Sequence, residues 1–315
     1  MKTRIIVAAV LLPIFFAILF IFPPYILTIM VAVICAIAAH ELLLATKVQK
    51  MSVHGYTILA AVLMPLAIYL DFLLGATPLM LVTLLLSIAF LLLCLLAIEA
   101  VLSLNKSDRG KPDKNKQVHK KGSGSKKAKA DAAKKVFKFR HIPVALAAGL
   151  LIPLLLSTLI SLRTTSYNIG HLLILLPVIA TILTDSGAYF TGVAIGKKKP
   201  FPNISPNKTV EGFIGGFIIG TAGMLIYGLI LSAVAPVDVR FAVLILYGVL
   251  GSFMTVLGDL TFSLIKRKCG IKDYGRLLPG HGGALDRFDS LIFAAPTMYL
   301  LTILIPAIIA TPYFS

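Results

Sequence analysis

The sequence is poor in charged residues, and acidic residues are especially few. Charged residues make up 14% of the 315 positions, and only 13 residues are Asp or Glu. Soluble domains usually contain about 45–50% apolar residues, whereas this chain contains 58% and has a mean hydropathy of +0.95. The chain is therefore too apolar for a water-soluble protein and too long for one buried core.

Cysteine is scarce as well, and the common nucleotide-binding motifs are missing. The three cysteines, Cys35, Cys94 and Cys269, are odd in number and far apart. This spacing excludes a disulfide framework and a Cys-x-x-Cys metal site. Neither a Walker A motif nor a Gly-x-Gly-x-x-Gly fingerprint occurs in the sequence, which argues against a soluble type of nucleotide-binding fold.

Long apolar runs are what the chain has instead. About 20 apolar residues cross a hydrocarbon layer of roughly 30 Å, and the backbone inside lipid has to be hydrogen-bonded within its own segment, so the runs should be helices. The first run follows a short basic start, as in a signal peptide, but no small-residue cleavage site follows it, so we interpret it as a membrane span. The sequence thus predicts an all-α polytopic integral membrane protein with about nine transmembrane helices: 5–22, 24–44, 55–73, 77–102, 143–162, 169–190, 212–235, 239–262 and 288–311.

Lys and Arg are divided very unevenly between the two sides that alternating loops define. The loops 45–54, 103–142, 193–211 and 263–287 carry 26 of the 30 basic residues. Cytoplasmic loops are enriched in Lys and Arg, so these loops are predicted to be cytoplasmic, with the N-terminus and the C-terminus both external. On a multi-pass protein of the cell membrane, the net charge of +17 indicates anionic membrane lipids as partners and not nucleic acid.

Composition divides the chain into three regions. Residues 1–102 are N-terminal transmembrane helices, and residues 143–315 form a C-terminal transmembrane region that holds the candidate chemistry. Between them, residues 103–142 contain 14 basic and 3 acidic residues, and the stretch 120–127 has no apolar face, so this cytoplasmic loop is predicted to be disordered. The loop is interpreted either as a solvated topology anchor or as a segment that attracts anionic lipid.

The acidic residues outside the basic loop gather in the C-terminal half. Six of the remaining ten lie at predicted cytoplasmic span ends or in the loops between them: Asp185, Glu211, Asp259, Asp273, Asp286 and Asp289. Charges at membrane depth are costly, so they are usually functional, paired or solvated. Asp259 lies near the end of an apolar helix with no local partner, whereas an ordinary polar loop explains Asp273 equally well.

The segment Asp286-Arg287-Phe288-Asp289 is the sharpest local feature. At the start of a helix its two carboxylates would lie on one face, at positions i and i+3. Such a pair suits Mg²⁺, which commonly binds one or two carboxylates together with substrate phosphates. The alternative is that both Asp residues only complement the helix dipole.

The residues before this segment favour the metal interpretation. Lys266, Arg267 and Lys272 and a glycine-rich turn over 278–283 precede it. Glycine lets backbone N–H groups approach an anion closely, and basic side chains neutralise phosphates, so the region is typical of phosphoryl-group chemistry. His281 is interpreted as a general base or phosphate donor, or else as a structural cap of the turn.

A second polar cluster lies upstream. Asp185 lies near the end of one predicted span, and Ser205-Pro206-Asn207-Lys208-Thr209 precedes the next. Lys208 and the neighbouring hydroxyl groups can hold a nucleotide or lipid phosphate. A capped, polar loop between two helices explains the same residues without any ligand.

Taken together, the two clusters resemble the signature of the phosphatidate cytidylyltransferase (CDP-diacylglycerol synthase) family. The resemblance is firm over about 180–295 and is one of hydropathy alone over 1–180. It departs from the family pattern at Ala284 and in the length of the basic loop. The matching residues are Ser263-Leu264-Ile265-Lys266-Arg267, Lys272-Asp273, His281-Gly282-Gly283, Asp286-Arg287-Phe288-Asp289, Asp185-Ser186-Gly187-Ala188-Tyr189 and Ser205-Pro206-Asn207-Lys208-Thr209.

The resemblance implies the reaction of CTP with phosphatidate to give CDP-diacylglycerol and pyrophosphate. It also implies a homodimer and Mg²⁺, with K⁺ as an optional second ion. The implied metal ligands are Asp259, Asp286 and Asp289. The implied catalytic residues are Asp286, Asp259, Lys266, Arg267, Lys272, His281 and Arg287. The implied substrate-binding residues are Asp185, Ser205, Asn207, Lys208, Thr209, Ser263, Asp273, Gly282 and Gly283.

A membrane transporter or channel with carboxylates at its cytoplasmic edge is the alternative function. It shares the predicted span count with the enzyme. It predicts charges near the middle of the bilayer, however, whereas the acidic residues here are predicted at the cytoplasmic ends of the spans.

Overall fold

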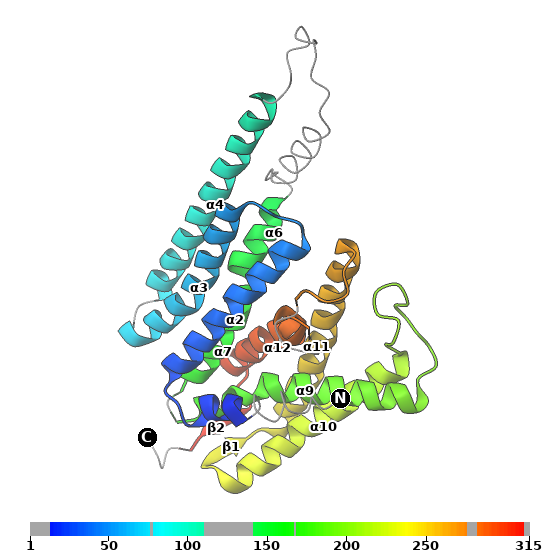
Figure 1. The fold of residues 1–315 in the computed structure, drawn as a ribbon. Helices are drawn as coiled ribbons and strands as arrows, with labels where there is room; N and C mark the ends of the chain where they lie inside the picture. Colours follow the sequence, from blue (N-terminus) through cyan, green and yellow to red (C-terminus); the bar gives the residue numbers. More distant parts are fainter. Residues whose placement is uncertain (1–12, 76–77, 110–140, 167, 276–281, 312–315) are drawn as a thin grey trace.

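The computed structural model describes residues 13–75, 78–109, 141–166, 168–275 and 282–311, and these residues are almost entirely helical (Figure 1). A short helical segment over residues 13–20 comes first. The labelled elements, in chain order, are α2 (Pro24–Ala45), α3 (Met51–Leu74), α4 (Pro78–Arg109), α6 (Ile142–Leu146), the π-helical turn η2 (Ala147–Leu151), α7 (Ile152–Thr164), α8 (Gly170–Leu173), α9 (Leu175–Ile195), α10 (Val210–Val234), β1 (Val237–Val239), α11 (Phe241–Cys269), α12 (Leu285–Leu304) and β2 (Ile308–Ala310).

Seven helical segments in the described residues are long and apolar enough to cross a membrane. They are Pro24–Ala45, Met51–Leu74, Ile142–Thr164, Gly170–Ile195, Val210–Val234, Phe241–Cys269 and Leu285–Leu304. Helix α4, at the predicted span 77–102, contributes a shorter apolar stretch over Leu84–Ala100. The all-α polytopic architecture is therefore confirmed, whereas the count of nine spans and the orientation stay predictions.

Two predicted segments fall largely outside the described residues. The first span, 5–22, is described only from residue 13 onward. Of the basic loop 103–142, the described part consists of the end of α4, which runs to Arg109, and the first two residues after the gap at 110–140. The sequence predicts disorder and lipid contact for all of 103–142; residues 103–109 are helical instead, as the end of α4, and nearly all the rest lies in that gap.

The helices form two groups that meet at α12. In one group α2, α3, α4 and α7 lie side by side, and in the other α9 packs along α10 and α11 (Figure 1). Helix α12 contacts α2 and α7 of the first group and α9 and α11 of the second. The helix that carries Asp286 and Asp289 is thus packed between the two halves of the chain.

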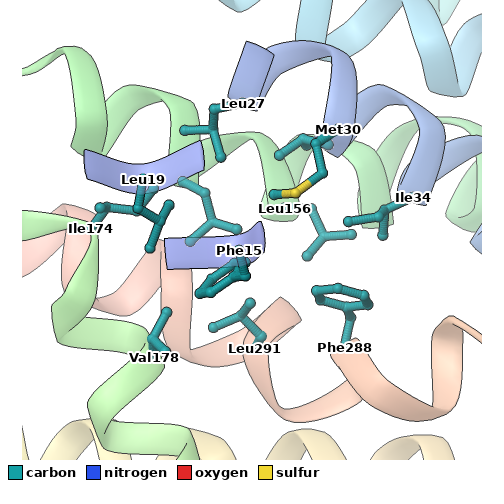
Figure 2. Close-up of a pocket in the computed structure, with 12 residues that line it drawn as sticks. Phe15, Leu19, Leu27, Met30, Ile34, Leu156, Ile174, Val178, Phe288 and Leu291 are labelled. Carbon is teal, nitrogen blue, oxygen red and sulfur yellow. The ribbon is translucent and has the colours of Figure 1, made fainter. Parts of the chain in front are cut away.

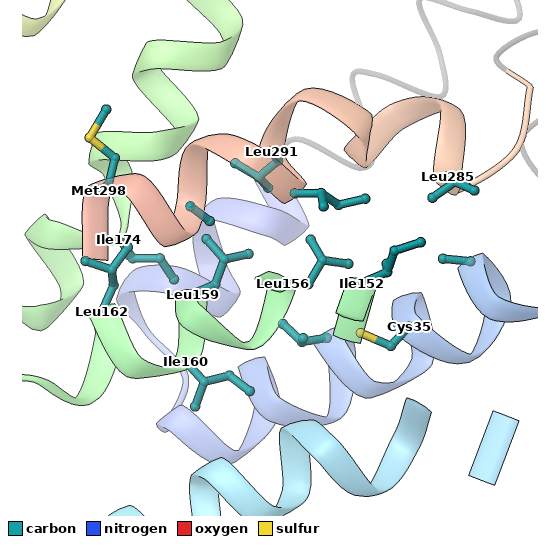
Figure 3. Packing of buried hydrophobic residues seen from close by; sticks show 14 of the residues in the cluster. Cys35, Ile152, Leu156, Leu159, Ile160, Leu162, Ile174, Leu285, Leu291 and Met298 are labelled. Carbon is teal, nitrogen blue, oxygen red and sulfur yellow. The ribbon is translucent and has the colours of Figure 1, made fainter. Parts of the chain in front are cut away.

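Aliphatic side chains fill the core around α12. Figure 3 shows Leu156 of α7 and Cys35 of α2 in the same layer as Leu285 and Leu291 of α12. Figure 2 shows a neighbouring apolar pocket, where Phe15 of the first helical segment lies beside Leu291. Lipid tails are as apolar as these side chains, so close packing and not water exclusion holds such helices together.

The contact between α9 and α10 depends on glycine. A Cβ atom at Gly212 would lie 2.8 Å from the carbonyl oxygen of Ala188, and one at Gly216 would lie 2.8 Å from that of Thr184. Small residues four positions apart let two helix backbones touch. At the start of α10 the Thr209 hydroxyl accepts a hydrogen bond from the Gly212 N–H at 3.1 Å. Thr209 thereby caps the start of α10 where the preceding loop ends.

Two short strands pair with each other at the C-terminal ends of α10 and α12. Strand β1 follows α10 and pairs antiparallel with β2, which follows α12, with Asp238 opposite Ile309. Because β1 follows the end of α10 and the loop 196–209 precedes its start, the strand pair and this loop lie at opposite ends of that helix.

We predict that Gly216→Ala lowers the free energy of unfolding by about 1–3 kcal/mol, because the added methyl group overpacks the contact between α9 and α10. Thermal unfolding of the purified protein in detergent measures the change. Gly55→Ala in α3 is the matched control, because no atom lies within 4 Å of its added Cβ. Equal melting temperatures for the two variants would contradict the close contact.

Candidate functional site

A cavity of about 640 Å³ with charged and apolar lining residues lies where α9, α10 and α11 meet the loop 196–209. Its chemistry-bearing residues come from the upstream half of the C-terminal region and from α11: Asp185, Lys199, Ser205, Asn207, Lys208, Thr209 and Asp259. The upstream loop and the isolated carboxylate of α11, which are some 50 positions apart in the chain, therefore face one space.

Lys208 interacts with charged and aromatic side chains from several helices around the cavity. Its ammonium group forms an ion pair with Asp259 and lies 5.8 Å from the centre of the Phe213 ring. The carboxylates of Asp185 and Asp289 also attract it electrostatically. Burial lowers the pKa of Lys208 from its usual value, and the two carboxylates oppose that shift. The loop thus places a partly desolvated cation among acidic side chains of three helices.

One face of α11 forms a polar seam against α12. Ser263 Oγ donates to Asp259 Oδ1 at 3.2 Å, and Lys266 Nζ donates to Asp286 Oδ1 at 2.9 Å. Asp259 and Lys266 are seven residues, or about 10 Å, apart along the helix. The two helices touch next to Asp259, because a Cβ atom at the preceding residue, Gly258, would lie 2.6 Å from the backbone oxygen of Asp289 in α12. Asp259 and Asp286 therefore both lie along the contact between α11 and α12, but about two helical turns apart.

Asp286 organises the turn before α12. Its Oδ2 accepts hydrogen bonds from the N–H groups of Tyr274 at 2.8 Å and Gly283 at 3.0 Å, in addition to the bond from Lys266. Only 4% of its side chain is exposed. Gly282 has a φ of +84°, a left-handed conformation that favours glycine. Asp286 does not line the cavity in this structure, so a cation shared by Asp259 and Asp286 stays a prediction.

Asp289 lies one helical turn further along α12 and is buried. Its Oδ1 accepts a hydrogen bond from the Ser290 N–H at 2.8 Å, and its carboxylate interacts with Lys266, Lys208 and Asp185. Asp289 therefore connects the Asp286 end of the seam to the cavity. Asp185 is joined to the same helix through Ser290.

The other predicted residues are placed more peripherally. Arg267 donates from its guanidinium group to the carbonyl oxygens of Ile204 at 3.2 Å and Ile271 at 3.3 Å, so it joins the end of α11 to the cavity loop. His281 lies outside the described residues. Three predicted residues are exposed and are not among those that line the cavity: Lys272, Asp273 and Arg287.

The donor set is compatible with a divalent cation that arrives with a phosphate ligand. Mg²⁺ needs only one or two protein carboxylates when water and phosphates supply its other ligands, and Asp185 and Asp259 both line the cavity. No three His, Cys, Asp or Glu side chains among the described residues are grouped closely enough to form a metal centre by themselves. The site therefore suits an open magnesium position and not a closed protein cage.

Glu41 is a site residue that the sequence analysis does not single out. It lies on α2, is 5% exposed, and accepts hydrogen bonds from the N–H groups of Ala284 at 3.1 Å and Leu285 at 2.9 Å. The signal in the sequence is the same as for Asp259, an acidic residue in an apolar span without Lys or Arg within one helical turn. The N-terminal helices thus reach the turn that carries Asp286.

Comparison with known proteins places the chain in a family. A profile of the Cytidylyltransferase family matches residues 2–305. The phosphatidate cytidylyltransferase of Bacillus subtilis (strain 168) is 49% identical over 118 residues, which cover 38% of this chain and 42% of that protein. Those of Staphylococcus saprophyticus and Staphylococcus aureus (strain COL) are 47% and 49% identical over 121 and 126 residues, which cover 38% of this chain and 45% of each relative.

The similarity to these relatives spans less than half of their length, whereas the family profile spans nearly the whole chain. On the extent of that match, this protein belongs to the Cytidylyltransferase family.

Proposed function

We propose that this chain is a phosphatidate cytidylyltransferase, a nucleotidyltransferase that converts CTP and phosphatidate into CDP-diacylglycerol and pyrophosphate. The observation that carries the proposal is the convergence of four aspartates and two lysines on one cavity and the seam beside it, within helices of membrane length: Asp185, Asp259, Asp286, Asp289, Lys208 and Lys266. The names of the three relatives support the choice of substrates. The transporter or channel alternative has no such support.

The ion pairs of the site suggest how it takes up a metal-bound nucleotide. Lys208 is paired with Asp259, and Lys266 is paired with Asp286. Asp259, Asp286 and Asp289 would hold Mg²⁺, and the two lysines would then turn to the phosphates. Each carboxylate exchanges one cation for another, and each ammonium exchanges one anion for another, so no charge is left buried without a partner.

In the proposed reaction a phosphate oxygen of phosphatidate attacks the α-phosphorus of CTP, the bond from that phosphorus to the bridging oxygen breaks, and pyrophosphate leaves. Bound Mg²⁺ would neutralise the charge on the phosphates. Lys208 and Lys266 position and neutralise the same groups, and Ser205, Asn207 and Thr209 are placed to bind substrate from the loop. A role for K⁺ rests on the family resemblance alone.

The cavity is large enough for a small-molecule ligand and is open toward the side of α9. Ligand pockets commonly have about 300–1,000 Å³, and this cavity has about 640 Å³. Tyr189 and Val193 line it and are also 65% and 72% exposed. These side chains extend from the cavity to the outer surface of α9. A lipid can therefore reach the cavity from the side of the helix bundle, while CTP enters from the end where the loop 196–209 lies.

We infer the orientation and setting of the protein from the distribution of charge. The loop 196–209 would face the cytoplasm, with both termini external and nine spans in the cell membrane. Arg267, Lys272, Asp273, His281 and Arg287 would meet the nucleotide from the cytoplasmic side. The homodimer is inferred from the family resemblance.

The first prediction from the proposed function concerns Asp286. Asp286→Asn keeps the shape of the side chain but removes the charge that Lys266 and a cation require, so we expect a loss of at least about a hundredfold in turnover. Purified protein in detergent, with labelled CTP, phosphatidate and Mg²⁺, gives the measurement. The control is Asp238→Asn in β1, an exposed aspartate at the other end of α10. Turnover equal to that of the control would remove Asp286 from the mechanism.

The second prediction concerns pH. The pKa of Lys208 is lowered, so its ammonium form, which attracts phosphates, is lost at a lower pH than in a free lysine. We expect kcat/KM for CTP to fall as pH rises through that lowered pKa, since this ratio reports groups of the free enzyme.

Lys208→Gln should lower kcat/KM for CTP at neutral pH by about tenfold or more, because one phosphate-binding cation is lost, and should abolish the alkaline fall. Lys268→Gln, at an exposed position on α11, is the control and should keep the wild-type pH profile. An alkaline fall that persists unchanged in Lys208→Gln would assign it to another group.

The third prediction tests orientation. Single cysteines are placed at exposed Asn203 and exposed Asp238 in a variant whose three native cysteines are replaced by alanine. A maleimide that does not cross membranes should label intact cells at position 238 and should label position 203 only after lysis. The reverse pattern would place the loop 196–209 outside the cell.

A further inference from the structure

Glu41 bridges the two halves of the chain at the edge of the site. It belongs to α2, and its carboxylate accepts hydrogen bonds from the backbone at Ala284 and Leu285, 243 and 244 residues later in the chain. Glu41 is 5% exposed. A buried carboxylate is costly unless it is hydrogen-bonded, and here both of its oxygens are used on one short segment.

The segment held by Glu41 is the start of α12. The first N–H groups of a helix have no partner within the helix, and a side-chain oxygen of the preceding residue usually accepts a hydrogen bond from one of them. The residue at that position is Ala284, which has no such oxygen and makes no side-chain cap. Glu41 supplies the missing acceptor from another helix, and its negative charge complements the helix dipole.

Two glycines are fitted to the Glu41 carboxylate. A Cβ atom at Gly283 or at Gly275 would overlap the oxygen atoms of Glu41. The backbone on both sides of residues 276–281 therefore packs directly against this one side chain. The sequence requires small residues there because the carboxylate occupies the space.

Two carboxylates divide the backbone donors of the turn between them. Asp286 accepts from Tyr274 and Gly283, and Glu41 accepts from Ala284 and Leu285. In the proposed mechanism Asp286 exchanges its bond with Lys266 for a cation. The hydrogen bonds of Glu41 do not depend on that exchange, so they can hold the turn in place while the partners of Asp286 change.

We propose that Glu41 is a positioning residue for nucleotidyl transfer: through the N–H groups of Ala284 and Leu285 it fixes the turn that presents Asp286 to the metal-bound nucleotide. The proposal rests on the function proposed above. It assigns to the N-terminal helices a direct part in the geometry of a site whose reacting groups all come from the C-terminal half.

The test compares Glu41→Gln with Glu99→Gln. Glutamine keeps the size of Glu41 but leaves one acceptor for two N–H groups, so kcat/KM for CTP should fall, and the Mg²⁺ concentration for half-maximal activity should rise, each by about tenfold or more. Glu99 is also buried and pairs with Lys50 on the N-terminal helices. Its variant should change the melting temperature and leave the CTP and Mg²⁺ dependence at wild-type values.

A second variant reaches the same contact from the other side, in case Glu41→Gln does not fold. Gly283→Ala pushes against the Glu41 carboxylate and should shift the CTP and Mg²⁺ dependence in the same direction, whereas Gly55→Ala, which has open space, should not. Wild-type values for both Glu41→Gln and Gly283→Ala would overturn the proposal.

Amide hydrogen exchange provides a readout that does not need turnover. Exchange in a peptide covering 282–290 should be faster in Glu41→Gln than in the wild type and in Glu99→Gln. Unchanged exchange in that peptide would overturn the positioning role. A wild-type protein that makes no CDP-diacylglycerol would overturn the proposed function instead, and the exchange measurement would still decide the role of Glu41.

Discussion

Charged side chains inside this apolar helical bundle are paired with one another, and this pairing decides how the C-terminal helices pack. An ammonium or carboxylate group without a partner is very costly at such a depth. Lys208 and Lys266 are paired with Asp259 and Asp286, and Asp289 interacts with both lysines. These contacts fix which faces of α11 and α12 meet, and they draw the loop 196–209 onto the helices.

Helix α12 transmits this arrangement to the whole chain. It packs on both helix groups, and its N-terminal turn is held by Asp286 from its own sequence and by Glu41 from α2. Close helix contacts, as at Gly216 and Gly258, leave little space for adjustment. A change at the N-terminal helices is therefore felt at the turn before α12 through hydrogen bonds and not through bulk packing alone.

The sequence predicts the helices well because the length and apolarity of a span follow directly from the thickness of the bilayer. It also predicts that Lys208, Asp185 and Asp259 have a common purpose, and the structure places all three at one cavity. Asp185 and Asp259 are charges that an apolar helix does not need, and Lys208 is a cation in the loop between two such helices. The role of Glu41 was not predictable, because its partners are backbone N–H groups, which leave no mark in the sequence. The distance between Asp259 and Asp286 along the seam was equally hidden, because it depends on which turn of α11 faces the start of α12.

The kind of donor that each carboxylate binds, backbone or side chain, separates the residues by the freedom they retain. Glu41 uses both oxygens on backbone donors, which cannot move without unwinding the start of α12. Asp286 shares one oxygen between two backbone donors, and its other oxygen accepts from Lys266, a flexible side chain. Asp259 accepts from Lys208 and Ser263, both side chains. The freedom to exchange partners thus increases from Glu41 through Asp286 to Asp259. A cation entering with a phosphate would displace existing partners most easily at Asp259, which lines the cavity. Glu41, whose partners are the least free to move, lies where the turn before α12 needs a fixed geometry.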